Sequence, residues 1–332
     1  MKRRTLVLAG ASLAAAPGPG FGQSQPKVVR IGILAGDLTA PHEEEALIAG
    51  LREQGLVEGR NLVLERRYAY GRLDMVPNLA RELAASKLDA VISTCTPTTL
   101  VAQQAFGATP GSTPIDMAAV ADPVGQRIIA SLARPGANVT GLASLSDEIM
   151  PKKLSLFAAV LRPKATVAVL VDASSNVHPR MWQTLEPVAA RLDLRLVQVQ
   201  AGRKPGQASL QDAVDAAAQR QVDGIVVLPD EPFFFARREE IVALLAKHRL
   251  PSMFGVREFV DLGGLMSYGE SLRTAFRSVG GYIGKIVAGS RPGEIPVAQP
   301  TEFELVINLK AAEALGITIP RDVLIGADSI IE

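Results

Sequence analysis

Two stretches of this sequence follow one plan: LAASKLDAVISTCTPTT, residues 83–99, and AAQRQVDGIVVLPDEPF, residues 217–233. Each runs from the end of a helical pattern through a short polar link to an aspartate, then into an apolar run and a loop that contains proline. Short apolar runs rich in β-branched residues are typical of buried strands. The two stretches therefore predict two copies of one α/β unit.

Strand and helix patterns alternate on both sides of these stretches. Apolar strand patterns occur at residues 28–34, 61–68 and 89–93, and again at 166–171, 194–200 and 224–228, with amphipathic helical patterns between them. Such alternation is typical of parallel sheets with crossover helices. A chain of 332 residues is long enough for two domains. We therefore expect an α/β fold of two Rossmann-like, doubly wound lobes joined by a hinge.

The composition excludes several classes of protein. Hydrophobic residues make up 48% of the chain and charged residues 21%, with a formal net charge of +1, so the chain is not a disordered protein. Basic residues are interspersed with acids, and no patch suits nucleic acid. Cys95 is the only cysteine, which rules out an intramolecular disulfide framework.

The N-terminus resembles a secretory signal peptide over residues 1–22. Lys2, Arg3 and Arg4 precede an apolar run at 5–16, and Gly20 and Gly22 flank Phe21 in the pattern of a cleavage site. The apolar run is shorter than the roughly 18 residues that a membrane span needs. We expect export to the periplasm, by the general or the twin-arginine route. We expect no membrane span in the remaining chain.

Ligands of open α/β sheets bind beyond the carboxyl ends of the strands, where two facing lobes would form a cleft. The residues at the predicted strand exits are therefore the candidates for ligand binding. They are Asp37, Thr94, Thr96, Pro97, Thr98, Ala121, Asp122, Ser174, Ser175, Asn176, Asp230, Glu231, Phe254 and Tyr268.

Opposite charges on a ligand can be matched at these exits. The threonines at 94–99 surround a predicted helix start, which suits a carboxylate, and Asp230 or Glu231 can pair with an ammonium group. An amino acid fits this arrangement. The alternative is a capping role: Thr98 can be an N-cap, and Asp122, directly before Pro123, is expected to cap a following helix.

Motifs of catalysis are missing from the sequence. The three histidines have no partner at metal-ligand spacing, and neither a GxSxG nor a GxxxxGK[ST] motif occurs. We therefore expect no cofactor, no metal and no enzymatic activity.

Four blocks of the chain carry a resemblance to a known family. They are GLREQGLVEGRNLVLERRYAYGRLD, DPVGQRIIASLARPGANVTG, HRLPSMFGVREFVDLGGLMSYG and QPTEFELVINLKAAEALGITIP. In this order they resemble the ABC-transporter substrate-binding proteins that include tryptophan- and tyrosine-binding members. The resemblance implies a type I periplasmic binding protein fold. It also implies a monomer that closes on a small ligand and delivers it to an ABC permease and its ATPase.

The resemblance also implies how the cleft is lined, with Phe254 and Tyr268 enclosing an apolar part of the ligand. One departure stands out, because Asp116 lies inside a strand that is apolar throughout in relatives. We expect residues 28–145 and 264–292 to form the N-terminal lobe, and 146–263 and 293–332 the C-terminal lobe.

Two other functions remain open at this stage. A sensor that reports its ligand to a membrane receptor would have the same two lobes, and the neighbouring genes would distinguish it from a transporter. An enzyme on the same scaffold is the second alternative, in which clustered carboxylates would supply acid–base chemistry.

Overall fold

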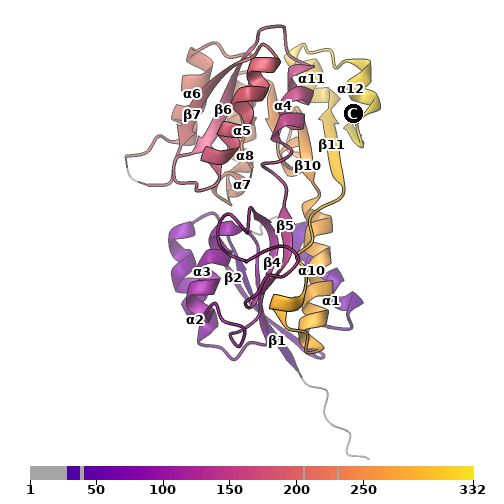
Figure 1. Ribbon diagram of the computed structural model, residues 1–332. Helices are drawn as coiled ribbons and strands as arrows, with labels where there is room; N and C mark the ends of the chain where they lie inside the picture. Colours follow the sequence, from indigo (N-terminus) through magenta and orange to yellow (C-terminus); the bar gives the residue numbers. More distant parts are fainter. Residues whose placement is uncertain (1–27, 38–40, 205, 230–231) are drawn as a thin grey trace, which may run out of the picture.

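The computed structural model describes residues 28–37, 41–204, 206–229 and 232–332. The predicted signal peptide at 1–22 lies outside these ranges. Within them the chain forms two α/β lobes, one above the other in Figure 1, with several connections running between them. None of the helices in the described ranges is both long and apolar enough to cross a membrane.

The first lobe contains a parallel sheet of five described strands in the order β2-β1-β3-β4-β5. Because the strands are parallel, all of their carboxyl ends lie at one edge, which faces the second lobe. The strands are β1 (Val29–Ala35), β2 (Leu62–Tyr68), β3 (Ala90–Ser93), β4 (Ile115–Ala121) and β5 (Val139–Ser144).

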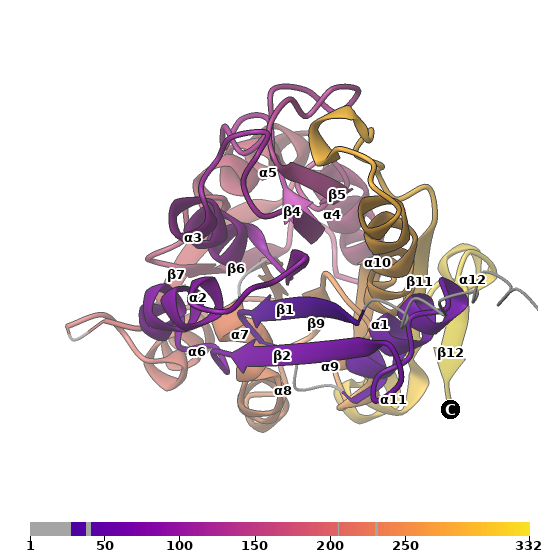
Figure 2. The same ribbon diagram turned by 90° about the horizontal axis from the view of Figure 1, so that it is seen from below.

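Helices cover both faces of this sheet. On one face, Ile31 and Ile33 pack against α1 (Pro41–Glu53) and α10 (Leu272–Val287). On the other, Leu34 and Val91 pack against α2 (Val76–Ala84) and α3 (Thr96–Phe106). Figure 2 shows α1 and α10 on the opposite side of β1 from α3. The strands are buried on both faces, which explains why their sequences are continuous apolar runs.

The second lobe repeats this arrangement. Its sheet has the order β12-β11-β10-β9-β8-β6-β7 over the described strands. The part β7-β6-β8-β9-β10 is parallel and has the same order as the first sheet; β11 pairs with β10 antiparallel and β12 with β11 parallel. The strands are β6 (Thr166–Asp172), β7 (Arg195–Ala201), β8 (Gly224–Val227), β9 (Ser252–Phe254), β10 (Met266–Glu270), β11 (Phe303–Asn308) and β12 (Ser329–Ile331).

Helices again form two layers on this sheet. One layer consists of α4 (Met150–Ala158), α5 (His178–Arg191), α11 (Leu309–Leu315) and α12 (Arg321–Ile325). The other consists of α6 (Leu210–Gln219), α7 (Pro232–Ala236), α8 (Arg238–Lys247) and α9 (Glu258–Asp261).

The aspartates of the two quoted stretches, Asp89 and Asp223, make equivalent hydrogen bonds in the two lobes. An oxygen of Asp89 accepts a hydrogen bond from the backbone N–H of Arg30 at 2.9 Å, and the Asp89 N–H donates back to the Arg30 carbonyl at 2.8 Å. Asp223 and Thr166 exchange the same two bonds, both at 2.7 Å. Each aspartate thus fixes the start of a third strand to the start of the first, which supports the predicted repeat.

The lobe boundaries differ from those expected in two places. Residues 264–270 lie in the second lobe, because β10 pairs with β9 and β11. The chain enters the first lobe only at α10 and stays there beyond residue 293, since Ala298 pairs with Leu142 beside β5. Strand pairing decides these boundaries, and an isolated apolar run does not reveal its neighbour.

The helix expected after Asp122 is absent from the described segment between β4 and β5. Residues 123–127 form turns instead. Asp122 and Arg127 both adopt left-handed backbone angles, with φ of 42° and 58°, which interrupt a helix. The Asp122 carboxylate accepts a hydrogen bond from the N–H of Gly125 at 3.0 Å, so it closes a turn.

Asp116 is buried near the start of β4. Neither of its carboxylate oxygens has a hydrogen-bond partner among the described residues. Burial raises the pKa of Asp116 well above its usual range. The folded protein therefore keeps this proton at a pH at which the unfolded chain, with an ordinary aspartate pKa of about 3.9, has released it.

Stability should consequently fall as the pH rises from about 4 toward the raised pKa, because proton release from Asp116 favours the unfolded chain. Asp116→Asn removes this release, so the variant should become progressively more stable relative to the natural protein as the pH rises. Urea unfolding across that range measures the difference. Asp74→Asn, at an exposed position, is the control. A stability difference that does not change with pH would contradict the prediction.

Helices α1 and α10 touch backbone to backbone. A Cβ atom on Gly280 would lie 2.0 Å from the carbonyl oxygen of Gly50, whereas one on the adjacent Gly281 would meet nothing within 4 Å. Gly280→Ala should destabilise the protein by about 1–3 kcal/mol, the usual cost of overpacking. Gly281→Ala should stabilise it by up to about 1 kcal/mol through helix propensity. Urea unfolding of both variants tests the contact; equal effects would refute it.

Candidate ligand-binding site

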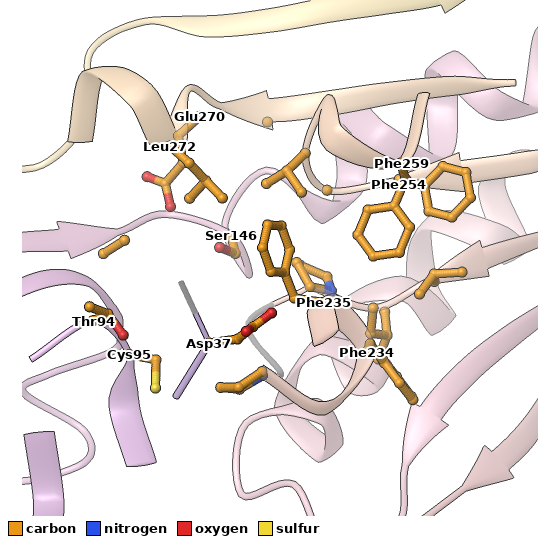
Figure 3. A pocket seen from close by; sticks show the side chains of 18 of the residues that line it. Asp37, Thr94, Cys95, Ser146, Phe234, Phe235, Phe254, Phe259, Glu270 and Leu272 are labelled. Atoms are coloured by element: carbon orange, nitrogen blue, oxygen red, sulfur yellow. The ribbon is translucent and has the colours of Figure 1, made fainter. Parts of the chain in front are cut away.

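A pocket lies between the lobes, at the carboxyl ends of the parallel strands of both sheets (Figure 3). Its empty volume is about 910 Å³, including the mouth that opens to solvent. A volume of this order suits a small organic molecule. The residues that line it are Asp37, Glu43, Thr94, Cys95, Thr96, Ala119, Ser146, Ile149, Lys153, Val227, Leu228, Pro229, Pro232, Phe234, Phe235, Phe254, Gly255, Val256, Phe259, Gly269, Glu270, Leu272 and Phe276.

The first lobe contributes the polar wall. Thr94, Cys95 and Thr96 follow β3 at the start of α3, and Figure 3 shows Thr94 and Cys95 across the pocket from the phenylalanines. The hydroxyl oxygen of Thr94 accepts from the N–H of Gly36 at 3.3 Å, and that of Thr96 from the N–H of Ala121 at 3.2 Å. Each of these two hydroxyls keeps its proton to donate.

The second lobe contributes an aromatic wall. Phe254 and Phe259 stack with ring centroids 4.6 Å apart, and Phe235 meets Phe259 edge to face at 6.3 Å. In Figure 3 the ring of Phe235 lies between Ser146 and Phe254. The guanidinium of Arg238 lies over Phe235, 4.7 Å from the ring centre. This wall offers flat apolar surfaces of the kind that enclose an aromatic or other planar group.

Charged side chains enter the pocket where the chain crosses between lobes. Lys153 lies on the first turn of α4, just after the chain crosses from β5 into the second lobe. Its side chain is fully buried. A Cβ atom on Gly255 would lie 3.4 Å from its Nζ atom, so the ammonium group is close to the aromatic wall. Glu270 ends β10 at the second crossing and is also buried. The pocket therefore contains buried charges of both signs.

A group of acids lies at the α1 side of the pocket. Asp37 forms an ion pair with Arg238 at 3.6 Å, and Glu43 is buried beside them. Burial, together with the nearby charges of Glu258 and Asp37, raises the pKa of Glu43 to about 9, although Arg238 opposes the shift. Carboxylates thus outnumber cations here.

The two lobes are in contact across the cleft. His42 of α1 lies 3.2 Å from Glu258 of α9, and Arg180 of α5 pairs with Asp122 beyond β4. Gly36 approaches α7 so closely that a Cβ atom on it would lie 2.6 Å from a side-chain carbon of Pro232. The structure therefore describes a closed arrangement of the lobes.

The structure places four of the fourteen candidate residues in the wall of the pocket. Asp37, Thr94, Thr96 and Phe254 line it together, from the segment after β1, the β3–α3 turn and β9. Asp230 and Glu231 lie outside the described residues, although Pro229 and Pro232 on either side of them are in the wall. Their pairing with an ammonium group stays a prediction.

The remaining candidates lie elsewhere. Ser175 accepts hydrogen bonds from the N–H groups of Val177 and His178, both at 3.2 Å, at the start of α5. Thr98 is not the N-cap of α3, which is Cys95; its hydroxyl accepts from the N–H of Cys95 at 3.2 Å and donates to the Cys95 carbonyl at 2.9 Å. The other candidates outside the wall are Pro97, Ala121, Asp122, Ser174, Asn176 and Tyr268.

Tyr268 does not line the pocket, because its side chain lies on the opposite face of β10. On β10 it points toward Phe303, with ring centroids 6.1 Å apart, and packs in the layer of α4 and α5. The flanking Gly269 reaches the pocket instead. Neighbouring residues of a strand point to opposite faces, so the sequence alone did not reveal which of them faces the cleft.

Sequence reasoning missed Lys153, Glu43, Glu270 and the phenylalanines at 234, 235 and 259. For Lys153 a signal was present. It shares the helical spacing of Met150 and Phe157, both fully buried, so a lysine occupies the apolar face of α4. A charged residue on such a face is rare unless it is paired or functional.

Comparisons with known proteins agree with this arrangement. A family model described as ABC transporter substrate binding protein matches residues 38–331. A tyrosine-binding protein of Clostridioides difficile (strain R20291) is 25% identical over 275 residues, which cover 82% of this chain and 76% of the relative.

Two solved structures share the fold. A conserved domain protein from Vibrio cholerae O1 biovar El Tor strain N16961 has a TM-score of 0.82 and 28% identity, over 92% of this chain and 100% of the other. An ABC domain in complex with L-Trp, from Streptococcus pneumonia, has a TM-score of 0.79 and 24% identity, over 91% and 99%. The chain therefore belongs to the ABC transporter substrate binding protein family, and its two lobes form the type I periplasmic binding protein fold that the sequence predicts.

Proposed function

We propose that this protein is the extracytoplasmic receptor of an ABC importer and that it binds an aromatic amino acid, or a close relative, between its lobes. The observation that carries the proposal is the combination of a phenylalanine wall with buried charges of both signs in one interlobe pocket. The tyrosine-binding relative and the fold shared with an L-Trp complex are consistent with it.

Each part of such a solute has a counterpart in the wall. Its ring would lie against Phe235 and Phe254, its carboxylate would face the ammonium of Lys153, and its ammonium would face Asp37 or Glu270. Hydrogen bonds between charged groups are stronger than those between neutral groups, and they become stronger still when a closed pocket excludes water. The hydroxyl of Thr94 could donate to the carboxylate as well.

Because the pocket lies between two lobes, solute binding also affects how the lobes are arranged. A solute that contacts both walls favours the closed arrangement over an open one, because the contacts with the second wall are made only on closure. We propose that a permease with its ATPase recognises this closed form. Export through the predicted signal peptide at residues 1–22 would place the protein where it meets both solute and permease.

A solute screen tests the proposed ligand class. Tryptophan, tyrosine or phenylalanine should raise the midpoint of thermal unfolding, because at a concentration of 100 times Kd a ligand stabilises by about 2.7 kcal/mol. The analogues indole-3-propionate, without the ammonium, and tryptamine, without the carboxylate, should bind at least about tenfold more weakly in calorimetry, since each loses hydrogen bonds between charged groups. Stabilisation by sugars or by aliphatic amino acids alone would refute the proposal.

Lys153→Met tests the site of the carboxylate. Loss of a hydrogen bond to a charged group costs about 1.5–3 kcal/mol, so the affinity for the amino acid should fall by roughly 10- to 150-fold, whereas tryptamine should lose much less. Lys152→Met is a matched control, because Lys152 precedes it on the same helix and is exposed. Equal affinity of both variants for the amino acid would place the carboxylate elsewhere.

A further inference from the structure

Three side chains with metal-binding atoms meet at the contact between the lobes. His42, Glu43 and Glu258 each offer a ligand atom, and these atoms lie within 4.8 Å of one another. His42 and Glu43 are adjacent on α1 of the first lobe, and Glu258 begins α9 of the second. Only the folded, closed protein brings them together.

Two carboxylate oxygens in this cluster are buried without a hydrogen-bond partner among the described residues. They are Oε1 of Glu43 and Oε2 of Glu258, and the two residues are 1% and 5% exposed. An unsatisfied buried carboxylate oxygen is costly. Two such oxygens lie in the same cluster. A cation bound between them would satisfy both.

The charges around the cluster favour the same conclusion. The carboxylates of Asp37 and Glu258 both act electrostatically on Glu43, and Arg238 pairs with Asp37 at 3.6 Å. Further out, Arg257 interacts with Glu258 and is shared between Glu304 and Asp261, both at 3.3 Å. A divalent cation between Glu43 and Glu258 would satisfy both buried carboxylates.

We propose that His42, Glu43 and Glu258 bind a divalent transition metal, with zinc as the best fit, and that this site bridges the two lobes. Histidine nitrogen and glutamate oxygen are both zinc ligands, and three protein ligands leave a fourth coordination position open. Calcium prefers six to eight oxygen ligands, and magnesium binds histidine poorly. His42, about two-fifths exposed, gives the ion a route in from solvent.

Such a site would couple metal binding to closure. When the lobes separate, Glu258 moves away from His42 and Glu43, so a bound ion would stabilise the closed arrangement. This coupling requires the two-lobed fold but no particular solute. Metal binding can therefore be measured on solute-free protein, and its failure would be distinct from failure of the proposed solute site.

The test uses the chain purified without a histidine tag and treated with EDTA. Calorimetric titration with zinc chloride at neutral pH, without solute, should give one equivalent bound and a rise in the thermal midpoint. Millimolar calcium or magnesium should not reproduce it. Absence of saturable zinc binding would overturn the proposal.

Variants from both lobes test whether the site bridges them. Changing a residue that only supports a metal ligand commonly costs 10- to 100-fold in affinity. Loss of a ligand itself, in Glu43→Gln or Glu258→Gln, should therefore weaken zinc binding by at least about tenfold. His248→Ala is the matched control, because His248 contacts Asp215 at 2.7 Å within one lobe and should leave affinity unchanged. The thermal midpoint of each variant without metal verifies its folding.

Small-angle scattering then reports on the lobes themselves. Zinc should lower the radius of gyration of the solute-free natural protein but not that of Glu258→Gln. Zinc binding that survives Glu258→Gln at full strength, or that leaves the radius of gyration unchanged, would overturn the bridging site.

Discussion

The contact between α1 and α10 is the constraint on which the rest of the molecule depends. At Gly50 and Gly280 the two helices meet backbone to backbone, which holds α10 on the first lobe. Because α10 directly follows β10 of the second lobe, the chain must cross the cleft just after Glu270. The crossing puts Glu270 and Leu272 into the pocket wall.

The same exchange occurs in the other direction. β5 is the last strand of the first sheet, yet the helix that follows it, α4, packs on α5 in the second lobe. Lys153 reaches the pocket from that helix. Thus α4 follows a strand of the first lobe but packs on the second, and α10 follows a strand of the second lobe but packs on the first. Lys153 and Glu270, at these two crossings, carry opposite charges. A hinge built from several crossings lets the lobes part while these residues stay at its centre.

The buried charges explain why binding and closure belong together here. Lys153 and Glu270 are almost fully buried with the lobes in contact, and taking a charge out of water is costly. A ligand of matching charge lowers that cost only when both walls meet it. Asp116, far from the cleft on β4, is different: burial keeps it protonated, and it contributes a pH dependence that is unrelated to the pocket.

The sequence by itself determined the class of fold. Alternating patterns and the repeated aspartate before the third strand predict two α/β units, because local hydrogen bonding and burial on both faces of a sheet leave a direct trace in residue order. It also predicted that Thr94, Thr96 and Phe254 lie at strand ends. Only the tertiary structure decided that β10 joins the second sheet, that Tyr268 faces away from the cleft, and that His42 meets Glu258. These facts depend on strand pairing and lobe contact between residues far apart in the chain, where spacing along the sequence carries no information about distance.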